Sequence, residues 1–299
     1  MVQGQRILVA AFEGRFVTWL VIGSRGQLGS DLMDLLGDRA VGLDVPEIDI
    51  TNLDSVSNAM NDCAPHVVVN CAAYTAVDAA ESDEIRAGLV NATGAANVAR
   101  ASGRSRLMHV STDYVFDGRS STPYPESAPP NPASAYGRTK RAGERAVLTH
   151  TNAYVVRTAW LYGANGENFV KTMLRLEQAH DTLDVVDDQV GQPTWSHDLA
   201  RQLMLLGDSD AAPGIYHGTN AGRTSWYGFT RRIFELIGAD PDRVKPTTTD
   251  RFPRPAPRPA FSVLGHDRWS QQGLPEMRPW DEALADALPL IAAHVKDER

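Results

Sequence analysis

A tyrosine and a lysine stand four residues apart in the motif Tyr136-Gly-Arg-Thr-Lys140, near the start of a segment with helical character. On a helix this spacing places the phenol and the ammonium one turn apart on the same face. A nearby lysine cation favours the phenolate, and bringing the pKa of a phenol from about 10 towards 7 takes roughly 4 kcal/mol. The pair could therefore donate a proton near neutral pH, although an exposed helix pair without any chemistry has the same spacing.

Polar side chains follow two apolar runs that have the character of buried strands. Ser111-Thr112-Asp113 comes directly after the run 107–110, and residues 72–75 follow the β-branched run 66–71. Because ligands of open α/β sheets bind outside the carboxyl ends of the strands, we expect these groups at one crevice. A simple turn at the end of a strand uses the same residue types. Thr112 is the hydroxyl that would join Tyr136 and Lys140 in a catalytic group.

A glycine motif, GxxGxxG, spans Gly23 to Gly29 between the apolar run 16–22 and the amphipathic segment 27–36. A tight turn from a strand into a helix needs glycine, and a backbone that approaches a pyrophosphate cannot carry side chains. The free N–H groups of the helix N-terminus then favour the phosphates. The motif predicts a dinucleotide site, and the alternative is a glycine turn that serves packing alone.

The elements that must position these groups alternate between strand and helix. We expect strands at 16–22, 40–43, 66–71, 107–110 and 154–156, and helices at 27–36, 78–101, 135–150, 197–206, 225–237 and 281–295. This alternation predicts an α/β fold, a Rossmann-type doubly wound parallel sheet with a smaller C-terminal α/β lobe. We assign residues 1–160 and about 186–210 to the NAD(P)-binding domain, and 161–185 and 211–299 to the substrate lobe. Residues 1–15 do not fit the pattern.

The composition excludes several classes of protein. The formal net charge of −8, without a basic tract, argues against nucleic-acid binding. The longest apolar run has seven residues, which is too short for a membrane span. The two cysteines, Cys63 and Cys71, lack metal-ligand spacing, the eight histidines are not paired on a helix face, and the N-terminus does not read as a signal peptide. We expect a cytoplasmic protein, a monomer or homodimer, with no protein-built metal site.

Eight segments, in this order, resemble the dTDP-4-dehydrorhamnose reductase family of the extended short-chain dehydrogenase/reductase superfamily. They are GSRGQLG (23–29), EIDITN (47–52), NCAAYTAVDAAE (70–81), STDYVFDG (111–118), YGRTKRAGE (136–144), RTAWLYG (157–163), DDQVGQPTW (187–195) and RPAFSVL (258–264). The resemblance spans about residues 17–290. It implies reduction of the 4-keto group of dTDP-4-dehydro-L-rhamnose to dTDP-L-rhamnose, a sugar nucleotide for cell-envelope polysaccharide, by NADPH or, as a second choice, NADH.

The resemblance also implies roles for individual residues. Catalysis would fall to Thr112, Tyr136 and Lys140, with Tyr136 donating the proton and Lys140 holding the nicotinamide ribose and keeping the pKa of the phenol low. The cofactor would contact Gly23, Arg25, Gly26, Gln27, Leu28, Gly29, Asp49, Ile50, Ala72, Ala73, Tyr74 and Thr75 beside Tyr136 and Lys140. The sugar nucleotide would contact Thr75, Val77, Thr112, Asp113, Tyr114, Trp160 and Arg258. Arg25 favours NADPH, because a guanidinium in the glycine turn suits a 2′-phosphate, whereas Asp44 could compete as a ribose clamp.

Alternatives remain within and outside this family. Related 4,6-dehydratases carry glutamate where this chain has Tyr114, so elimination is disfavoured, but another 4-ketoreductase or an epimerase would use the same three catalytic residues. A non-catalytic, NADP-binding regulatory subunit resembles the family too, although Thr112, Tyr136 and Lys140 are all present here. Some members bind Mg²⁺ through glutamates, for which Asp31 is only a weak candidate. Arg251 and Arg254 are further candidates for contacts with the dTDP diphosphate. Directly after the segment RPAFSVL, this chain has Gly265 where the family resemblance implies an acidic residue.

Overall fold

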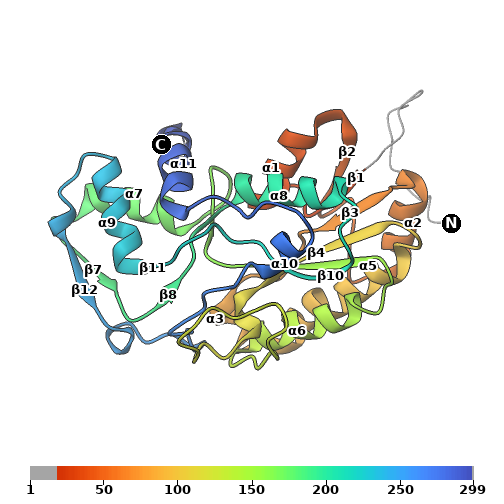
Figure 1. The fold of residues 1–299 in the computed structure, drawn as a ribbon, viewed down its shortest axis with the longest axis horizontal. Coiled ribbons are helices and arrows are strands. Elements are labelled where there is room, and N and C mark those ends of the chain that lie inside the picture. Colours follow the sequence, from red (N-terminus) through yellow and green to blue (C-terminus); the bar gives the residue numbers. More distant parts are fainter. Residues whose placement is uncertain (1–18, 298–299) are drawn as a thin grey trace.

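The computed structural model describes residues 19–297 and centres on a six-stranded parallel sheet (Figure 1). Its order is β10-β5-β4-β3-β1-β2, and every neighbouring pair is parallel. The strands are β1 (Trp19–Ile22), β2 (Ala40–Leu43), β3 (Val67–Asn70), β4 (Arg106–Thr112), β5 (Ala153–Thr158) and β10 (Gly214–His217). The predicted start of the first strand at 16–18, and the segment 1–15, lie outside the described residues.

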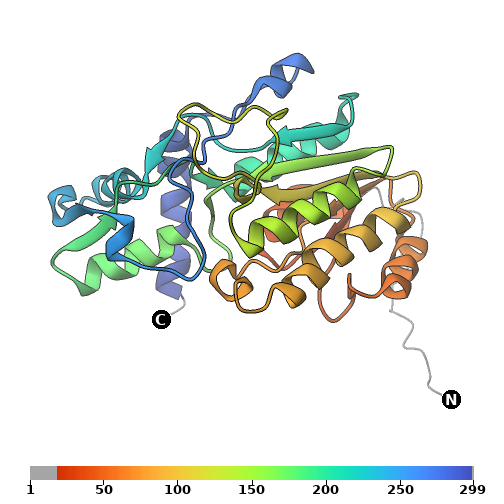
Figure 2. The same ribbon diagram turned by 90° about the horizontal axis from the view of Figure 1, so that it is seen from below.

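Helices cover both faces of the sheet because successive strand residues point to opposite sides. Trp19, Val21 and Val69 pack under α1 (Gln27–Leu36) and α8 (Ser196–Asp208). Leu20 and Ile22 pack on the other face, which is covered by α2 (Leu53–Cys63), α5 (Ala95–Ala101) and α6 (Ala135–Val147). Figure 2 shows α5 and α6 side by side on this face. The predicted doubly wound sheet is confirmed.

The segment expected to form one helix at 78–101 is broken. It contains α3 (Val77–Ala80), α4 (Glu84–Gly88) and a π-helical turn (Leu89–Gly94) before α5. The Asp83 side chain accepts a hydrogen bond from the backbone N–H of Arg86 and so starts a new helix. Asn91, in the π-helical turn, bonds both the N–H and the carbonyl of Tyr74. These polar contacts override the alanine-rich helical pattern.

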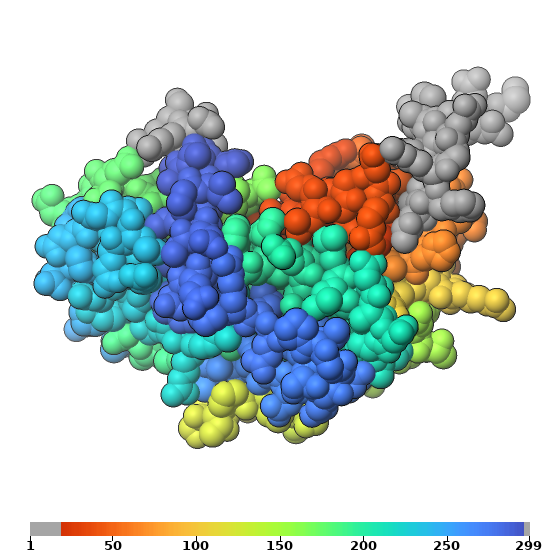
Figure 3. All heavy atoms as spheres, turned by 45° about the horizontal axis from the view of Figure 1, so that its top comes forward, coloured from red at the N-terminus to blue at the C-terminus, as the bar shows by residue number. Residues whose placement is uncertain are grey.

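The smaller lobe has its own apolar core. It comprises α7 (Phe169–Ala179), α9 (Trp226–Leu236), α11 (Trp280–Asp297) and three strand pairs, β7 (Leu183–Val186) with β12 (Val244–Thr247), β8 (Val190–Gly191) with β11 (Thr224–Ser225), and β6 (Leu161–Tyr162) with β9 (Thr194–Trp195). Figure 3 shows α11 in dark blue beside the light-blue residues of α9. No helix within residues 19–297 is long and apolar enough to cross a membrane.

The structure differs from the predicted division of the chain at two places. Residues from about 186 to 210 were assigned to the NAD(P)-binding domain, but β8 and β9 pair with strands of the smaller lobe, and Trp195 packs in the core of that lobe. Residues 211–299 were assigned to the smaller lobe, but β10 is the edge strand of the main sheet and pairs with β5. Trp269, in the short helix α10 (Asp267–Gln271), and Met277 also pack in the core under α1 and α8. β10 is only four residues long and begins with glycine, so its sequence alone gives a weak strand signal.

Candidate active site

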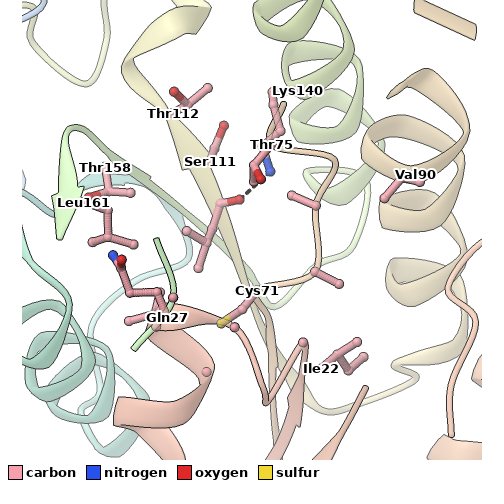
Figure 4. A pocket seen from close by; sticks show the side chains of 18 of the residues that line it. Ile22, Gln27, Cys71, Thr75, Val90, Ser111, Thr112, Lys140, Thr158 and Leu161 are labelled. Atoms are coloured by element: carbon pink, nitrogen blue, oxygen red, sulfur yellow. Dashed lines mark hydrogen bonds between the residues drawn. The ribbon is translucent and has the colours of Figure 1, made fainter. Parts of the chain in front are cut away.

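A cavity of about 680 Å³ lies where β1, β3, β4 and β5 end. β1 and β3 end level with each other, since Ile22 pairs with Asn70. β4 and β5 run three residues further, since Asn70 pairs with His109 and Thr112 pairs with Thr158. Of the predicted residues, the cavity is lined by Gly23, Gly26, Gln27, Leu28, Gly29, Asp49, Ile50, Ala72, Ala73, Thr75, Val77, Thr112, Asp113, Tyr114, Tyr136, Lys140 and Trp160. Figure 4 shows Gln27, Thr112 and Lys140 coming to it from three different elements.

The glycine turn brings backbone close to backbone. Gly23 has a φ of +80°, and a Cβ there would lie 2.8 Å from the nitrogen of Ala72. A Cβ on Gly29 would lie 2.1 Å from the carbonyl oxygen of Gly23. Gly26 is the N-cap of α1 and has no side chain to satisfy the first N–H groups of the helix. The turn therefore presents free N–H donors to the cavity, as a bound diphosphate requires.

Helix α6 places Tyr136 and Lys140 at the ends of β4 and β5. Ser134 caps it by accepting the N–H of Gly137 at 3.1 Å. A Cβ on Gly137 would lie 2.1 Å from the carbonyl oxygen of Tyr114, so glycine lets the helix start against the strand end. The ammonium of Lys140, which is 2% exposed, donates to the carbonyl of Val110 at 2.6 Å. The ammonium of Lys140 is thus fixed by a backbone contact, and the ring of Tyr136 by edge-on packing against Tyr114.

Burial is the main cause of the shifts in the pKa values of Tyr136 and Lys140. Burial, and secondarily the nearby carboxylate of Asp113, raise the pKa of Tyr136 to about 12, while the hydroxyl of Thr112 opposes this rise. Burial lowers the pKa of Lys140 to about 8, against the carboxylate of Glu144. Lys140 is not among the groups that shift the pKa of the phenol, so its role in keeping that pKa low stays a prediction. Desolvation outweighs any effect of the cation on the phenol.

Asp113 is a buried carboxyl group at the wall of the cavity. It begins a 3₁₀ turn after β4 and is 2% exposed. The hydroxyl of Thr112 donates to its Oδ1 at 3.0 Å and accepts the backbone N–H of Tyr114 at 3.2 Å. Burial raises the pKa of Asp113 to about 6, opposed by the hydroxyls of Ser262 and Thr112. Ser262, in the segment 258–264, therefore lies close to this carboxyl.

Three predicted residues do not line the cavity. The guanidinium of Arg25 donates to the carbonyl of Val45 at 2.8 Å and pairs with Glu47 at the surface. The ring of Tyr74 packs against Ala80, Ala87 and Ala135. Arg258 pairs with Asp78 at 2.8 Å and borders a separate small cavity beside Tyr114. In each case the side chain contacts other residues of the chain outside the cavity.

Several residues that line the cavity had no site role predicted from the sequence. They include Cys71, Val110, Thr158, Leu161 and Glu167. Asp44, which was considered as a ribose clamp, and Ser111, which was expected at the crevice, line the cavity too. Asp44 follows β2 and accepts the backbone N–H of Arg25 at 2.9 Å. Cys71 directly follows β3, and Thr158 is the last residue of β5. Their position at strand ends is the signal that could have identified them as site residues.

A buried ion pair lies directly behind the site. Arg157 on β5 donates to both oxygens of Glu144, at 2.8 and 2.9 Å, and both side chains are fully buried. Glu144 lies one turn after Lys140 on α6, and its Oε1 also accepts the hydroxyl of Ser111 at 2.7 Å. The pair ties the helix that carries Tyr136 to β5, and the hydrogen bond from Ser111 ties the same helix to β4, the strand that carries Thr112.

Within residues 19–297 no three His, Cys, Asp or Glu side chains group closely enough to hold a metal ion. Asp31, the weak candidate for Mg²⁺, is 8% exposed on α1, and burial raises its pKa against the effects of Ser196 and His197. The donor set around it does not fit a divalent cation, which prefers several carboxylates. Arg251 and Arg254 are exposed in the proline-rich connection.

The fold and site together define the extended short-chain dehydrogenase/reductases, which are oxidoreductases that use a nicotinamide dinucleotide. Residues 17–292 match the family model described as RmlD substrate binding domain, and the chain belongs to this family. The resemblance predicted from the sequence is therefore confirmed, and the protein is an oxidoreductase.

Relatives of known name agree with this assignment. The chain is 50% identical to a probable dTDP-4,6-dihydroxy-2-methyloxan-3-one 4-ketoreductase of Streptomyces antibioticus, covering 92% of this chain and 96% of that protein. It is 48% identical to the dTDP-4-dehydrorhamnose reductase of Streptomyces griseus, with 91% and 93% covered. The structure of the Bacillus anthracis dTDP-4-dehydrorhamnose reductase in complex with NADP superposes with a TM-score of 0.88, at 37% identity, covering 92% and 99%.

Proposed function

We propose that the protein reduces the 4-keto group of dTDP-4-dehydro-L-rhamnose to a hydroxyl, with NADPH as the preferred cofactor and NADH as a poorer one. The observation that carries this proposal is the convergence of Thr112, Tyr136 and Lys140 on one cavity with the glycine turn. The relatives named dTDP-4-dehydrorhamnose reductase support the choice of sugar. The NADP bound to the Bacillus anthracis relative supports the choice of cofactor.

Each catalytic residue has a definite task in this reaction. The nicotinamide supplies a hydride to C4 of the sugar when it is bound. Tyr136 gives its phenolic proton to the carbonyl oxygen, and Thr112 turns its O–H from Asp113 to donate to the same oxygen. Lys140 holds the nicotinamide ribose and supplies positive charge near the phenolate that forms. Tyr136 then regains a proton from solvent.

The remaining predicted residues are proposed to bind the two ligands. Gly26, Gln27 and Leu28 would line the diphosphate of the cofactor. The donors would be the N–H groups of Gln27 and Leu28, because the N–H of Gly26 donates to the carbonyl of Gly23. Asp49 and Ile50 would lie by its adenine, and Ala73 and Thr75 by its ribose and diphosphate. Arg25 would have to leave Glu47 to meet a 2′-phosphate. Val77, Tyr114 and Trp160 would face the sugar, and Arg258 the dTDP diphosphate.

A second keto-sugar is favoured by a specific finding. Besides the ketoreductase of Streptomyces antibioticus, the chain is 49% identical to the dTDP-4-keto-6-deoxy-D-glucose reductase of Streptomyces niveus, with 92% and 98% covered. The site chemistry is the same for both sugars. The two are separated by measuring kcat/KM for dTDP-4-dehydro-L-rhamnose and for dTDP-4-keto-6-deoxy-D-glucose on the same preparation. The proposal expects the former to be the better substrate, and the reverse order would transfer the assignment to the second sugar.

A further inference from the structure

Trp160 has an unusual backbone conformation at the wall of the cavity. It follows β5 and has a φ of +46°, in the left-handed region that bulky residues rarely adopt. Such a conformation persists only where the surroundings hold it, and it concentrates at ligand sites. The carbonyl of Trp160 accepts the N–H of Thr194 at 3.1 Å, which fixes the main chain. This conformation directs the indole of Trp160 towards two residues of the smaller lobe, Trp226 and Gly191.

The indole of Trp160 stacks on the indole of Trp226. The ring centroids are 3.5 Å apart and the planes differ by 7°. Trp226 is the first residue of α9, in the smaller lobe, and it is not among the residues that line the cavity. Its Nε1 donates to Gln189 at 3.1 Å, and Phe169 packs against its ring at 4.4 Å. Trp226 is thus held on its own lobe while it holds Trp160.

Gly191 fixes the edge of the same indole. A Cβ at this position would lie 2.5 Å from Cε2 and 2.7 Å from Cζ2 of Trp160, so only glycine leaves the ring where it is. Gly191 lies on β8, opposite Thr224 of β11, and Trp226 comes two residues after Thr224. The strand pair of β8 and β11 therefore positions both residues that contact the Trp160 indole, because Gly191 lies on β8 and Trp226 directly follows β11.

We propose that Trp226 and Gly191 determine which sugar the site accepts, by holding the Trp160 indole as a flat, fixed wall of the cavity. The inference rests on the proposed function, in that the ligand is a dTDP-linked 6-deoxyhexose. Trp160 would touch the sugar, and Trp226 and Gly191 are positioning residues that act through it. A rigid aromatic plane complements the C–H face of a deoxysugar and collides with sugars whose substituents project from that face.

The test measures binding without turnover. With saturating NADPH, the affinities of dTDP-L-rhamnose and of dTDP are measured by calorimetry for the wild type, Trp226→Leu, Trp226→Phe and Gly191→Ala. We expect Trp226→Leu and Gly191→Ala to weaken dTDP-L-rhamnose roughly 3- to 10-fold and dTDP by less than about twofold, the range expected from one aromatic pair. Trp226→Phe, which keeps an aromatic face, should stay within about twofold of the wild type.

Trp280→Phe is the matched control, because Trp280 packs on Phe229 in the core of the same lobe. It should change neither affinity. Stacked indoles give a coupled signal in near-ultraviolet circular dichroism, which Trp226→Leu should lose and Trp280→Phe should keep. The inference is overturned if the ratio of the two affinities is the same in wild type, Trp226→Leu and Gly191→Ala, if the signal survives in Trp226→Leu, or if the wild type binds dTDP-L-rhamnose no tighter than dTDP.

Turnover separates this inference from the proposed function. A wild type that binds dTDP-L-rhamnose but does not reduce dTDP-4-dehydro-L-rhamnose contradicts the proposed function, and the affinity ratios still decide the inference. A wild type that reduces the keto-sugar, with Trp226→Leu showing the same preference between it and dTDP-4-keto-6-deoxy-D-glucose, contradicts the inference alone. The inference expects this preference to fall roughly 3- to 10-fold in Trp226→Leu.

Discussion

Asp113 is a residue of the site whose burial lowers the stability of the folded protein at neutral pH. Its carboxyl is buried and its pKa is raised to about 6. A carboxyl with a raised pKa stabilises the folded state while it is protonated, at low pH, and this contribution is lost as the pH rises through about 6. Above that pH the folded protein carries a buried charge that the unfolded chain would solvate. This loss of folding stability comes from the buried charge of Asp113.

Replacing this carboxyl by an amide removes the cost. We expect Asp113→Asn to gain stability relative to the wild type, with the gain about 2 kcal/mol larger at pH 7.5 than at pH 4.5, since one pKa unit is worth about 1.4 kcal/mol. Urea unfolding at the two pH values measures it. Asp210→Asn, an exposed site, serves as the control and should show no such difference. The same gain for Asp113→Asn at both pH values would contradict the raised pKa.

We propose that Arg25 lets the site distinguish NADPH from NADH. Its side chain is 60% exposed, and its guanidinium pairs with Glu47 and donates to the carbonyl of Val45. Both contacts are at the surface, so turning to a 2′-phosphate costs little. We expect Arg25→Ala to weaken NADPH on the order of tenfold and NADH by less than about twofold, because only NADPH carries the phosphate. Fluorescence titration with both cofactors measures this. Equal losses would mean that Arg25 is only a turn residue.

At the scale of elements, α6 depends on the buried pair of Glu144 and Arg157. Removing one partner leaves an uncompensated charge in the core, so we expect Glu144→Gln to lower the free energy of unfolding by about 3–5 kcal/mol. Glu84→Gln removes a surface pair with Arg138, both side chains 45% exposed, and should cost less than about 1 kcal/mol. Urea unfolding compares the two variants. A similar small loss in both would show that the buried pair does not fasten the helix.

The turn between β1 and α1 allows no side chain at Gly29. A Cβ there would meet the carbonyl of Gly23, so Gly29→Ala must shift the start of α1 and its N–H groups. We expect NADPH binding to weaken by an order of magnitude or more. Gly88→Ala, whose Cβ would meet its nearest neighbour at 3.8 Å, is the control and should bind NADPH normally. Normal binding by Gly29→Ala would show that this turn does not hold the phosphates.

The elements recognised from sequence are those with a strong local signal. The buried strands β1, β3 and β4, the amphipathic α1, and the helix that carries Tyr136 all follow from local hydrophobic patterning. We did not predict α2 or α7, and β10 was placed in the wrong lobe. The break before α5 depends on Asn91, whose partner Tyr74 is 17 residues away. Patterning within a window carries no information about such partners.

At the scale of the whole molecule, the residues at strand ends could be predicted from the sequence. The contacts between residues of the two lobes could not. The glycine turn and the catalytic residues lie at the ends of strands, and the sequence placed them together. The stack of Trp160 on Trp226 joins residues 66 positions apart, and the ion pair of Arg258 with Asp78 joins residues 180 apart. Neither has a periodic or motif signature.

The central claim is that Tyr136 donates the proton in a reduction by NADPH. The measurement is the oxidation of NADPH at 340 nm with dTDP-4-dehydro-L-rhamnose, run on the wild type and on Tyr136→Phe, with NADPH affinity determined for both. We expect the wild type to turn over, and Tyr136→Phe to lose on the order of 10²–10⁴ in rate while it binds NADPH nearly as well. Turnover by Tyr136→Phe at the wild-type rate would contradict the assignment, as would a wild type that binds NADPH but leaves the sugar unreduced.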